Sequence, residues 1–189
     1  MNSTWELGLR SSLQLALAVL LLAGVAASAS AKVYHSRTEA LALAFPDAER
    51  VESETHVLSD HQVVRIQELA RSEIDSKLVN VYRGMRGDEV LGYAFIDIHT
   101  VRTLPEAFMV ILSPEGNVRS LRILAFHEPL EYQPARGWYG QFERKSLTEP
   151  LRVGNDIHGV VGATLSARAT TRGVRRALAL YQVLVNDGK

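Results

Sequence analysis

Residues 78–126 contain four short apolar stretches separated by turn-forming residues. β-Branched and aromatic residues are frequent in each stretch, which is typical of strands. Arg86-Gly87-Asp88 follows the first stretch, and Ser113-Pro114-Glu115-Gly116-Asn117 precedes the last, with Pro and Gly where tight turns favour them. Strands joined by short turns run antiparallel. We therefore predict an antiparallel meander of about four strands, over residues 78–85, 90–98, 108–112 and 118–126.

Two helices are predicted before this sheet. Ser36 stands three residues before Glu39, and Ser59 stands three residues before Gln62, so each pair has the form of a capping box. Pro46 ends the first helix, because proline cannot continue a helical hydrogen-bond ladder. The second helix covers about residues 60–71, where apolar residues recur at helical spacing.

A third helix is predicted from about Thr164 to the C-terminus. Its apolar residues fall at intervals of four, three and four, on one face: Val174, Leu178, Tyr181 and Val185. Four arginines, at positions 168, 172, 175 and 176, lie mostly off that face, and we expect them to be solvated. The pattern as a whole predicts an α+β domain, with N-terminal helices and a C-terminal helix packed beside the antiparallel sheet.

The first 31 residues differ from the rest of the chain. Arg10 precedes a run of about 15 apolar residues, and two Ala-x-Ala sequences follow it. This pattern predicts a secretory signal peptide over residues 1–31, and the alternative is a membrane anchor through residues 11–29. Either one places the domain over residues 32–189 in the periplasm or elsewhere outside the cytoplasm.

The composition excludes several kinds of site. The chain has 189 residues and no cysteine, so disulfides, c-type haem attachment and cysteine ligation of iron–sulfur clusters are absent. No pair of its six histidines has the spacing of a metal site on one helix, and we predict no metal site. The formal net charge is zero, and this argues against nucleic acid as a partner. Redox chemistry in this domain would therefore come from an organic cofactor or from a metal without thiolate ligands.

The sequence Gly162-Ala163-Thr164 leads directly into the last helix. The first turn of a helix presents unpaired backbone N–H groups and a partial positive charge, so it can bind a phosphate group. Gly162 would let the ligand approach the backbone, Thr164 offers a hydroxyl group, and Arg168 follows one turn later. The alternative is that Thr164 is an ordinary N-cap residue after a tight turn.

Gly162-Ala163-Thr164-Leu165-Ser166 resembles the signature of the FMN-binding domain family, which is roughly D-x-x-[ST]-G-A-T-x-[ST]. The family includes flavin subunits of Rnf-type and sodium-pumping respiratory complexes, and the periplasmic flavin domain of the nitrous-oxide-reduction regulator. The resemblance extends over about residues 78–184, including the sequences AFMVILSPEGNVRSLRIL and FHEPLEY. It implies that Thr164 carries FMN through a phosphoester bond, which a flavin transferase installs. We predict that the cofactor is bound there by Gly162, Ala163, Thr164, Leu165, Ser166 and Arg168.

This sequence departs from the signature at two positions. His158 aligns with the acidic residue and Val161 with the Ser or Thr, while Asp156 lies two positions early. The retained Thr164 favours covalent FMN, and noncovalent FMN at the same helix end is the alternative.

The isoalloxazine ring of FMN needs flat apolar cover. The long segment 127–150 holds aromatic residues and three prolines, and a loop of this length is uncommon unless it is functional. We predict that the ring contacts Glu128, Phe126, Leu130, Trp138 and Tyr139, with Glu128 at its polar edge as the resemblance suggests. The alternatives are that Phe126 belongs to the core, that Trp138 packs over the sheet edge and that Glu128 is a solvated loop residue.

We therefore expect an exported flavoprotein that carries electrons from a membrane-bound redox partner to an extracytoplasmic acceptor, without catalytic residues of its own. Two alternatives remain open: a cofactor-free binding or assembly module that kept the fold, and a small flavin-dependent reductase with a substrate pocket.

Overall fold

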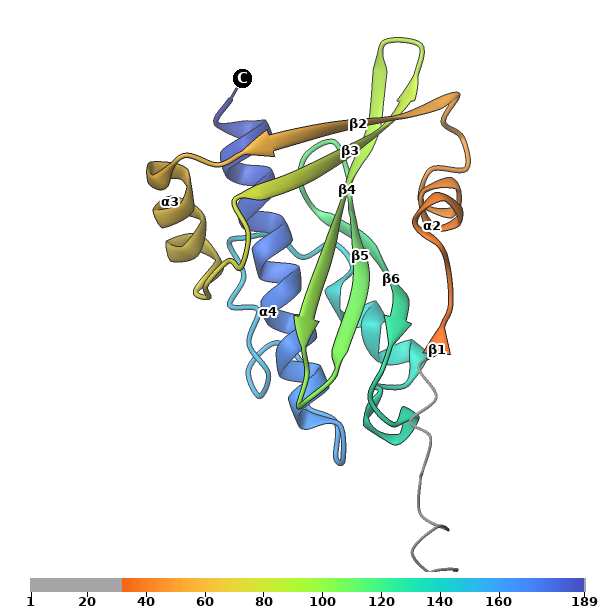
Figure 1. Ribbon diagram of the computed structural model, residues 1–189, viewed down its shortest axis with the longest axis vertical. Coiled ribbons are helices and arrows are strands. Elements are labelled where there is room, and N and C mark those ends of the chain that lie inside the picture. Colours follow the sequence, from red (N-terminus) through yellow and green to blue (C-terminus); the bar gives the residue numbers. More distant parts are fainter. Residues whose placement is uncertain (1–31, 189) are drawn as a thin grey trace, which may run out of the picture.

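The computed structural model describes residues 32–188, so the predicted signal peptide or anchor over residues 1–31 lies outside the described residues. The described residues form one six-stranded antiparallel sheet with helices packed on both faces (Figure 1). The strand order is β1-β6-β5-β4-β3-β2. The strands are β1 (Lys32–Val33), β2 (Arg50–Val57), β3 (Leu78–Arg86), β4 (Glu89–Thr100), β5 (Pro105–Leu112) and β6 (Val118–Phe126). The predicted α+β class and the central meander are confirmed.

Alternation along the central strands divides the core into two layers. In the β4–β5 pair, Phe95 lies opposite Val110, and both belong to the cluster under the C-terminal helix. Their neighbours Ala94 and Ile111 lie opposite each other and belong to the cluster on the other face. This period-2 pattern is why the sequence predicted these strands well.

The four predicted strands are present, and the sheet has two further edge strands that were not predicted. β1 has only two residues, and β2 is exposed along most of its length. In β2, Glu52 and Glu54 both lie near the guanidinium group of Arg83 on β3, at 3.5 and 3.1 Å. An edge strand with charged residues on a solvated face lacks an apolar stripe, so its sequence does not show the pattern of a half-buried strand.

Both predicted capping boxes are present. In α2 (Arg37–Ala44), the Ser36 hydroxyl accepts a hydrogen bond from the Glu39 N–H, and the Glu39 carboxylate accepts one from the Ser36 N–H. In α3 (Asp60–Ala70), Ser59 and Gln62 make the equivalent pair. The backbone groups at the start of each short helix are therefore satisfied by side chains.

The C-terminal helix α4 (Thr164–Tyr181) begins where the sequence predicted, and it continues as a π-helical turn, η3 (Gln182–Asn186). Two of its arginines are not solvated, which corrects our expectation. Arg175 is buried and donates to the carbonyls of Leu69, Glu149 and Pro150. Arg176 makes a two-pronged ion pair with Asp97 of β4, at 2.8 and 2.7 Å. These contacts attach α4 to α3, to the preceding loop and to the sheet.

The long segment after β6 is more regular than predicted. It contains two 3-10 helices, η1 (Leu130–Tyr132) and η2 (Arg136–Phe142), and η2 packs along β6. Across residues 32–188, the structure shows no helix that is both long enough and apolar enough to cross a bilayer.

Candidate functional site

The start of α4 has no side-chain cap. The N-cap residue is Ala163, whereas the Thr164 hydroxyl donates to the Val160 carbonyl at 3.1 Å. Gly162 has a φ of +83°, a left-handed conformation that favours glycine. A Cβ atom at Gly162 would meet no atom within 4 Å, so the space beside the backbone is open. The alternative that Thr164 serves as the N-cap is therefore wrong.

The open start of α4 contrasts with the capped starts of α2 and α3. The first backbone bond that enters α4 runs from the Ala167 N–H to the Ala163 carbonyl, at 2.9 Å. The N–H groups of the preceding first-turn residues have no acceptor within the helix. Together with the helix dipole they create a local positive potential at the exposed Thr164. This arrangement suits a phosphate group.

A pocket of about 200 Å³, which we call the Thr164 pocket, lies at this helix end. Two of its residues were not predicted from the sequence: Arg102, from the turn between β4 and β5, and Tyr132, from η1. The Arg102 guanidinium group lies over the Tyr132 ring, 4.6 Å from its centre, in a cation–π arrangement. The pocket thus combines a cation, an aromatic ring and a hydroxyl group. Its lining residues are Arg102, Tyr132, Gly162, Ala163, Thr164 and Leu165.

Ser166 holds the two walls of the pocket together. Its side chain is buried, and its hydroxyl donates to the Tyr132 carbonyl at 2.5 Å. This bond fixes η1 against the first turn of α4. Ser166, which we predicted as a cofactor-binding residue, therefore faces the protein interior and positions Tyr132.

Glu128 organises the turn that carries Arg102. One oxygen of its carboxylate accepts backbone N–H bonds from Arg102, Thr103 and Leu104, at 3.1, 2.7 and 2.9 Å. The Thr103 bond contributes most to a pKa below the ordinary glutamate value, and the bonds from Leu104 and Arg102 add to it, against the opposing effect of burial. The carboxylate is buried in these contacts, so the alternative of a solvated loop residue is wrong.

We expect Glu128→Gln to lower the free energy of unfolding at neutral pH by about 1–3 kcal/mol, because charge-assisted backbone hydrogen bonds become neutral ones. The carboxylate's pKa is lower in the folded chain than the unfolded value of about 4.3, so its contribution is complete above that value. The contribution disappears as the pH falls through the folded-state pKa. Urea unfolding of both proteins at neutral and acidic pH measures this, and a wild-type advantage unchanged at acidic pH would contradict it.

The other residues predicted to contact the flavin ring lie outside the Thr164 pocket. Phe126 is fully buried and belongs to the core, which was the alternative for this residue. Tyr139 is buried and lines a different pocket, together with Leu130. Trp138 packs edge-on against Tyr139 and Phe142, and its Nε1–H donates to the His158 carbonyl at 2.7 Å. This bond holds the segment that leads to Gly162.

Arg168 also lies elsewhere, in a separate hollow beside residues 151–153. Of the residues predicted to bind a cofactor, the structure gathers Gly162, Ala163, Thr164 and Leu165 in the Thr164 pocket. Arg102 supplies the cation of this pocket instead of Arg168. It stands in the short turn 101–104, which has no recognised motif, so no pattern in the sequence indicated it.

A buried polar cluster lies between the sheet and α4. The His99 ring contacts Asp97 at 2.7 Å and Glu106 at 3.2 Å. Burial lowers the pKa of His99, but the two carboxylates outweigh burial, and the net pKa is raised. Thr170 of α4 also approaches Glu106, at 3.5 Å. Together with the Asp97–Arg176 pair, these contacts fix the position of α4 on the sheet.

The fold and site define an α+β domain with an uncapped, anion-attracting helix start. No family model matches the chain. The chain is 29% identical to a subunit of the Na⁺-translocating ferredoxin:NAD⁺ oxidoreductase complex of Acetobacterium woodii, over 59% of this chain and 59% of the relative. The chain thus spans about three fifths of the length of the curated relative it matches. The similarity agrees with the resemblance to subunits of sodium-pumping complexes.

Proposed function

We propose that the protein is an FMN-binding, electron-carrying flavoprotein in which the open start of α4 receives the FMN phosphate. One observation carries this proposal: the chain caps α2 and α3 with side chains but leaves the first turn of α4 uncapped, beside an exposed threonine hydroxyl. The similarity to a component of an oxidoreductase complex supports an electron-transfer role.

The residues of the Thr164 pocket fit a phosphate group. The first-turn N–H groups of α4 and the Arg102 guanidinium would hold its oxygens, and charge-assisted hydrogen bonds of this kind are strong. The pocket, at about 200 Å³, is smaller than usual ligand pockets of about 300–1,000 Å³. The flavin ring would therefore extend over the half-exposed Leu165 and remain accessible to a redox partner. FMN itself supplies the electron-transfer chemistry.

A phosphoester bond at Thr164 is the attachment that we favour. The Thr164 hydroxyl is exposed, and the Val160 carbonyl orients its proton. The departure at His158 supports the noncovalent alternative, because Asp156 does not replace the missing acidic residue. Its carboxylate accepts N–H bonds from Leu151 and Arg152 and pairs with Lys145. A flavin transferase would then have to accept the altered local sequence.

We further propose that the protein works outside the cytoplasm with a membrane-bound redox partner. Residues 1–31 would act as a signal peptide, or residues 11–29 as an anchor. Val161 and Leu165 are exposed apolar residues on the segment that forms the start of α4. They offer a partner an apolar contact close to the flavin.

The direct test is to purify the full chain from cells that coexpress a flavin transferase, and to record its visible absorption spectrum. We expect flavin absorption bands. Acid precipitation then separates the two modes of attachment, because covalent flavin stays with the precipitate and noncovalent flavin enters the supernatant. A colourless protein of unmodified mass that ignores added FMN would overturn the proposal, and would favour the cofactor-free module that kept the fold.

A further inference from the structure

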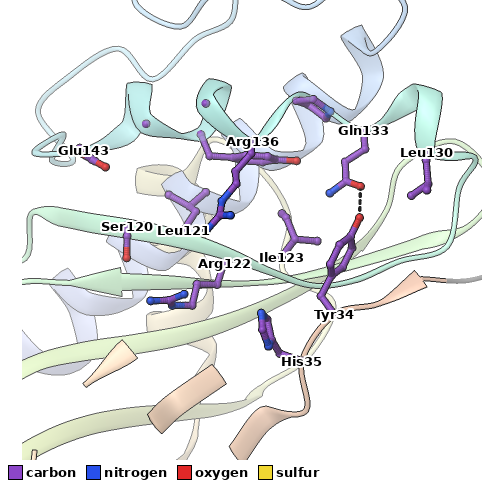
Figure 2. Close-up of a pocket in the computed structure, with 14 residues that line it drawn as sticks. Tyr34, His35, Ser120, Leu121, Arg122, Ile123, Leu130, Gln133, Arg136 and Glu143 are labelled. Atoms are coloured by element: carbon purple, nitrogen blue, oxygen red, sulfur yellow. Dashed lines mark hydrogen bonds between the residues drawn. The ribbon is translucent and has the colours of Figure 1, made fainter. Parts of the chain in front are cut away.

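A second pocket, of about 600 Å³, lies along the outer edge of β6 and shares no lining residue with the Thr164 pocket. Figure 2 shows Arg136 extending from η2 across this pocket toward Leu121 and Arg122 of β6. Tyr34 and Gln133 lie at one end, where the Tyr34 hydroxyl donates to the Gln133 side chain at 2.7 Å. We call this the β6-edge pocket. Its volume lies within the range of small-molecule sites.

The backbone of β6 limits what can occupy this pocket. At one end of the edge, the Tyr34 N–H donates to the Leu124 carbonyl at 2.8 Å. At the other end, Val118 exchanges hydrogen bonds with Arg144 and Lys145, at 2.7 and 2.9 Å. Residues 119–123 lie between these two sets of backbone hydrogen bonds, and they span about 16 Å at the usual rise per residue of a strand. An extended peptide could not pass through both ends, so the pocket suits a small molecule.

Two buried polar atoms point to the chemistry of that molecule. Within residues 32–188, four buried side-chain polar atoms lack a hydrogen-bond partner, and two of them, the Tyr139 hydroxyl and Arg122 Nε, belong to residues that line this pocket. Tyr139 is 8% exposed. Burial is the main cause of a raised Tyr139 pKa, the Glu106 charge adds to it, and the neighbouring Gln133 side chain opposes it without making a hydrogen bond of good geometry. The hydroxyl therefore stays protonated and can donate. Buried donors without acceptors are rare in folded proteins, and a bound acceptor would satisfy them.

The charges in the β6-edge pocket favour an anion. Arg122 and Arg136 line it, and neither has a carboxylate partner among the described residues. One nitrogen of the Arg122 guanidinium, Nη2, donates to the Leu43 carbonyl at 2.9 Å, which leaves the other nitrogens for a ligand. Glu143, the acidic residue of the lining, lies toward the end away from Gln133 in Figure 2. Leu121 and Ile123 add an apolar wall. A ligand that matches these features has an anionic head and an apolar body.

We propose that the β6-edge pocket binds a small organic carboxylate, with its head between Arg122 and Arg136 and its apolar body against Leu121 and Ile123. The Tyr139 hydroxyl would donate to the ligand. This inference does not rest on the proposed function, because no residue of the β6-edge pocket lines the Thr164 pocket. It also reassigns Leu130 and Tyr139 from the flavin ring to a second ligand.

Benzoate is a suitable probe, with benzyl alcohol as its uncharged counterpart. We expect benzoate, titrated to about 10 mM, to shift the backbone amide NMR signals of residues 120–123 and 137–140 of the full chain, since even millimolar affinity is then visible. Benzyl alcohol should bind at least about tenfold more weakly, because it lacks the charge that pairs with the guanidinium groups.

Two variants test the residues directly. Arg136→Gln and Tyr139→Phe should each weaken benzoate binding by roughly five- to tenfold, as expected for losing a charged or neutral hydrogen bond. Arg168→Gln, an exposed arginine outside the pocket, is the matched control and should leave it unchanged. Absent shifts at these amides, equal binding of benzyl alcohol, or displacement of benzoate by FMN would overturn the proposal. The last outcome would assign the pocket to the flavin.

Discussion

Replacing Thr164 by valine is expected to abolish covalent attachment of FMN while leaving the fold intact. Valine has the shape of threonine but no hydroxyl, so no oxygen remains to bond the phosphorus atom. The lost hydrogen bond to the Val160 carbonyl is at the surface and is worth about 1 kcal/mol or less. Intact mass of the variant, coexpressed with a flavin transferase, measures the attachment.

Thr164→Ser is the matched control, because it keeps the hydroxyl group. We expect this variant to retain at least part of the flavin mass increase. The phosphoester assignment would be refuted if Thr164→Val carried the same added mass as the wild type. If neither the wild type nor the variants gain mass, but FMN still binds reversibly, the noncovalent alternative holds.

Replacing Gly173 by alanine is expected to destabilise the fold, although alanine is the better helix former by about 1 kcal/mol. A Cβ atom at this position of α4 would lie 2.6 Å from the Phe108 ring and 2.7 Å from an Asp97 oxygen. Phe108 is fully buried, and Asp97 is fixed by Arg176 and His99, so neither neighbour can move easily. We expect a net loss of about 2 kcal/mol, because overpacking outweighs propensity.

Gly137→Ala provides the comparison, because a Cβ atom at Gly137 would meet no atom within 4 Å. Its effect on the free energy of unfolding should stay within about 0.5 kcal/mol. Thermal unfolding should show a melting temperature lower by about 4–8 °C for Gly173→Ala alone. A melting temperature of Gly173→Ala above that of the wild type would contradict this close packing of α4 against Phe108 and Asp97.

The sequence predicted those parts of the fold whose physical causes are local. α2 and α3 each begin with a capping box. Residues of β4 and β5 alternate between the two faces of the sheet, and both faces are buried there. β2 was missed because both of its faces are largely solvated. Arg175 was misjudged because its carbonyl acceptors at Leu69 and Glu149 are distant in the sequence. The helical spacing of residues does not reveal that a buried arginine has hydrogen-bond acceptors far away in the sequence.

In the candidate site, too, the residues that were predicted are those close together in the sequence. Gly162 and Thr164 were predicted because the backbone conformation and the hydroxyl group at a helix start are set by neighbouring residues. Arg102 joins them only through the fold, since the Glu128 carboxylate holds the turn that carries it. Glu128 was chosen from the resemblance, and the other flavin-ring candidates were chosen by residue type and by their place in or beside the segment 127–150. Residue type does not separate aromatic residues that pack against the core, such as the partly buried Trp138, from those that face a ligand.

The most direct measurement of the central claim compares the affinities of FMN and riboflavin for the full chain expressed without a flavin transferase. Riboflavin has the same ring system but no phosphate, so the comparison isolates the contacts at the start of α4. Quenching of flavin fluorescence reports both affinities. The phosphate site predicts that FMN binds at least about a hundredfold more tightly, as expected for several charge-assisted hydrogen bonds. Equal affinities of the two flavins, or binding of neither, would contradict the account.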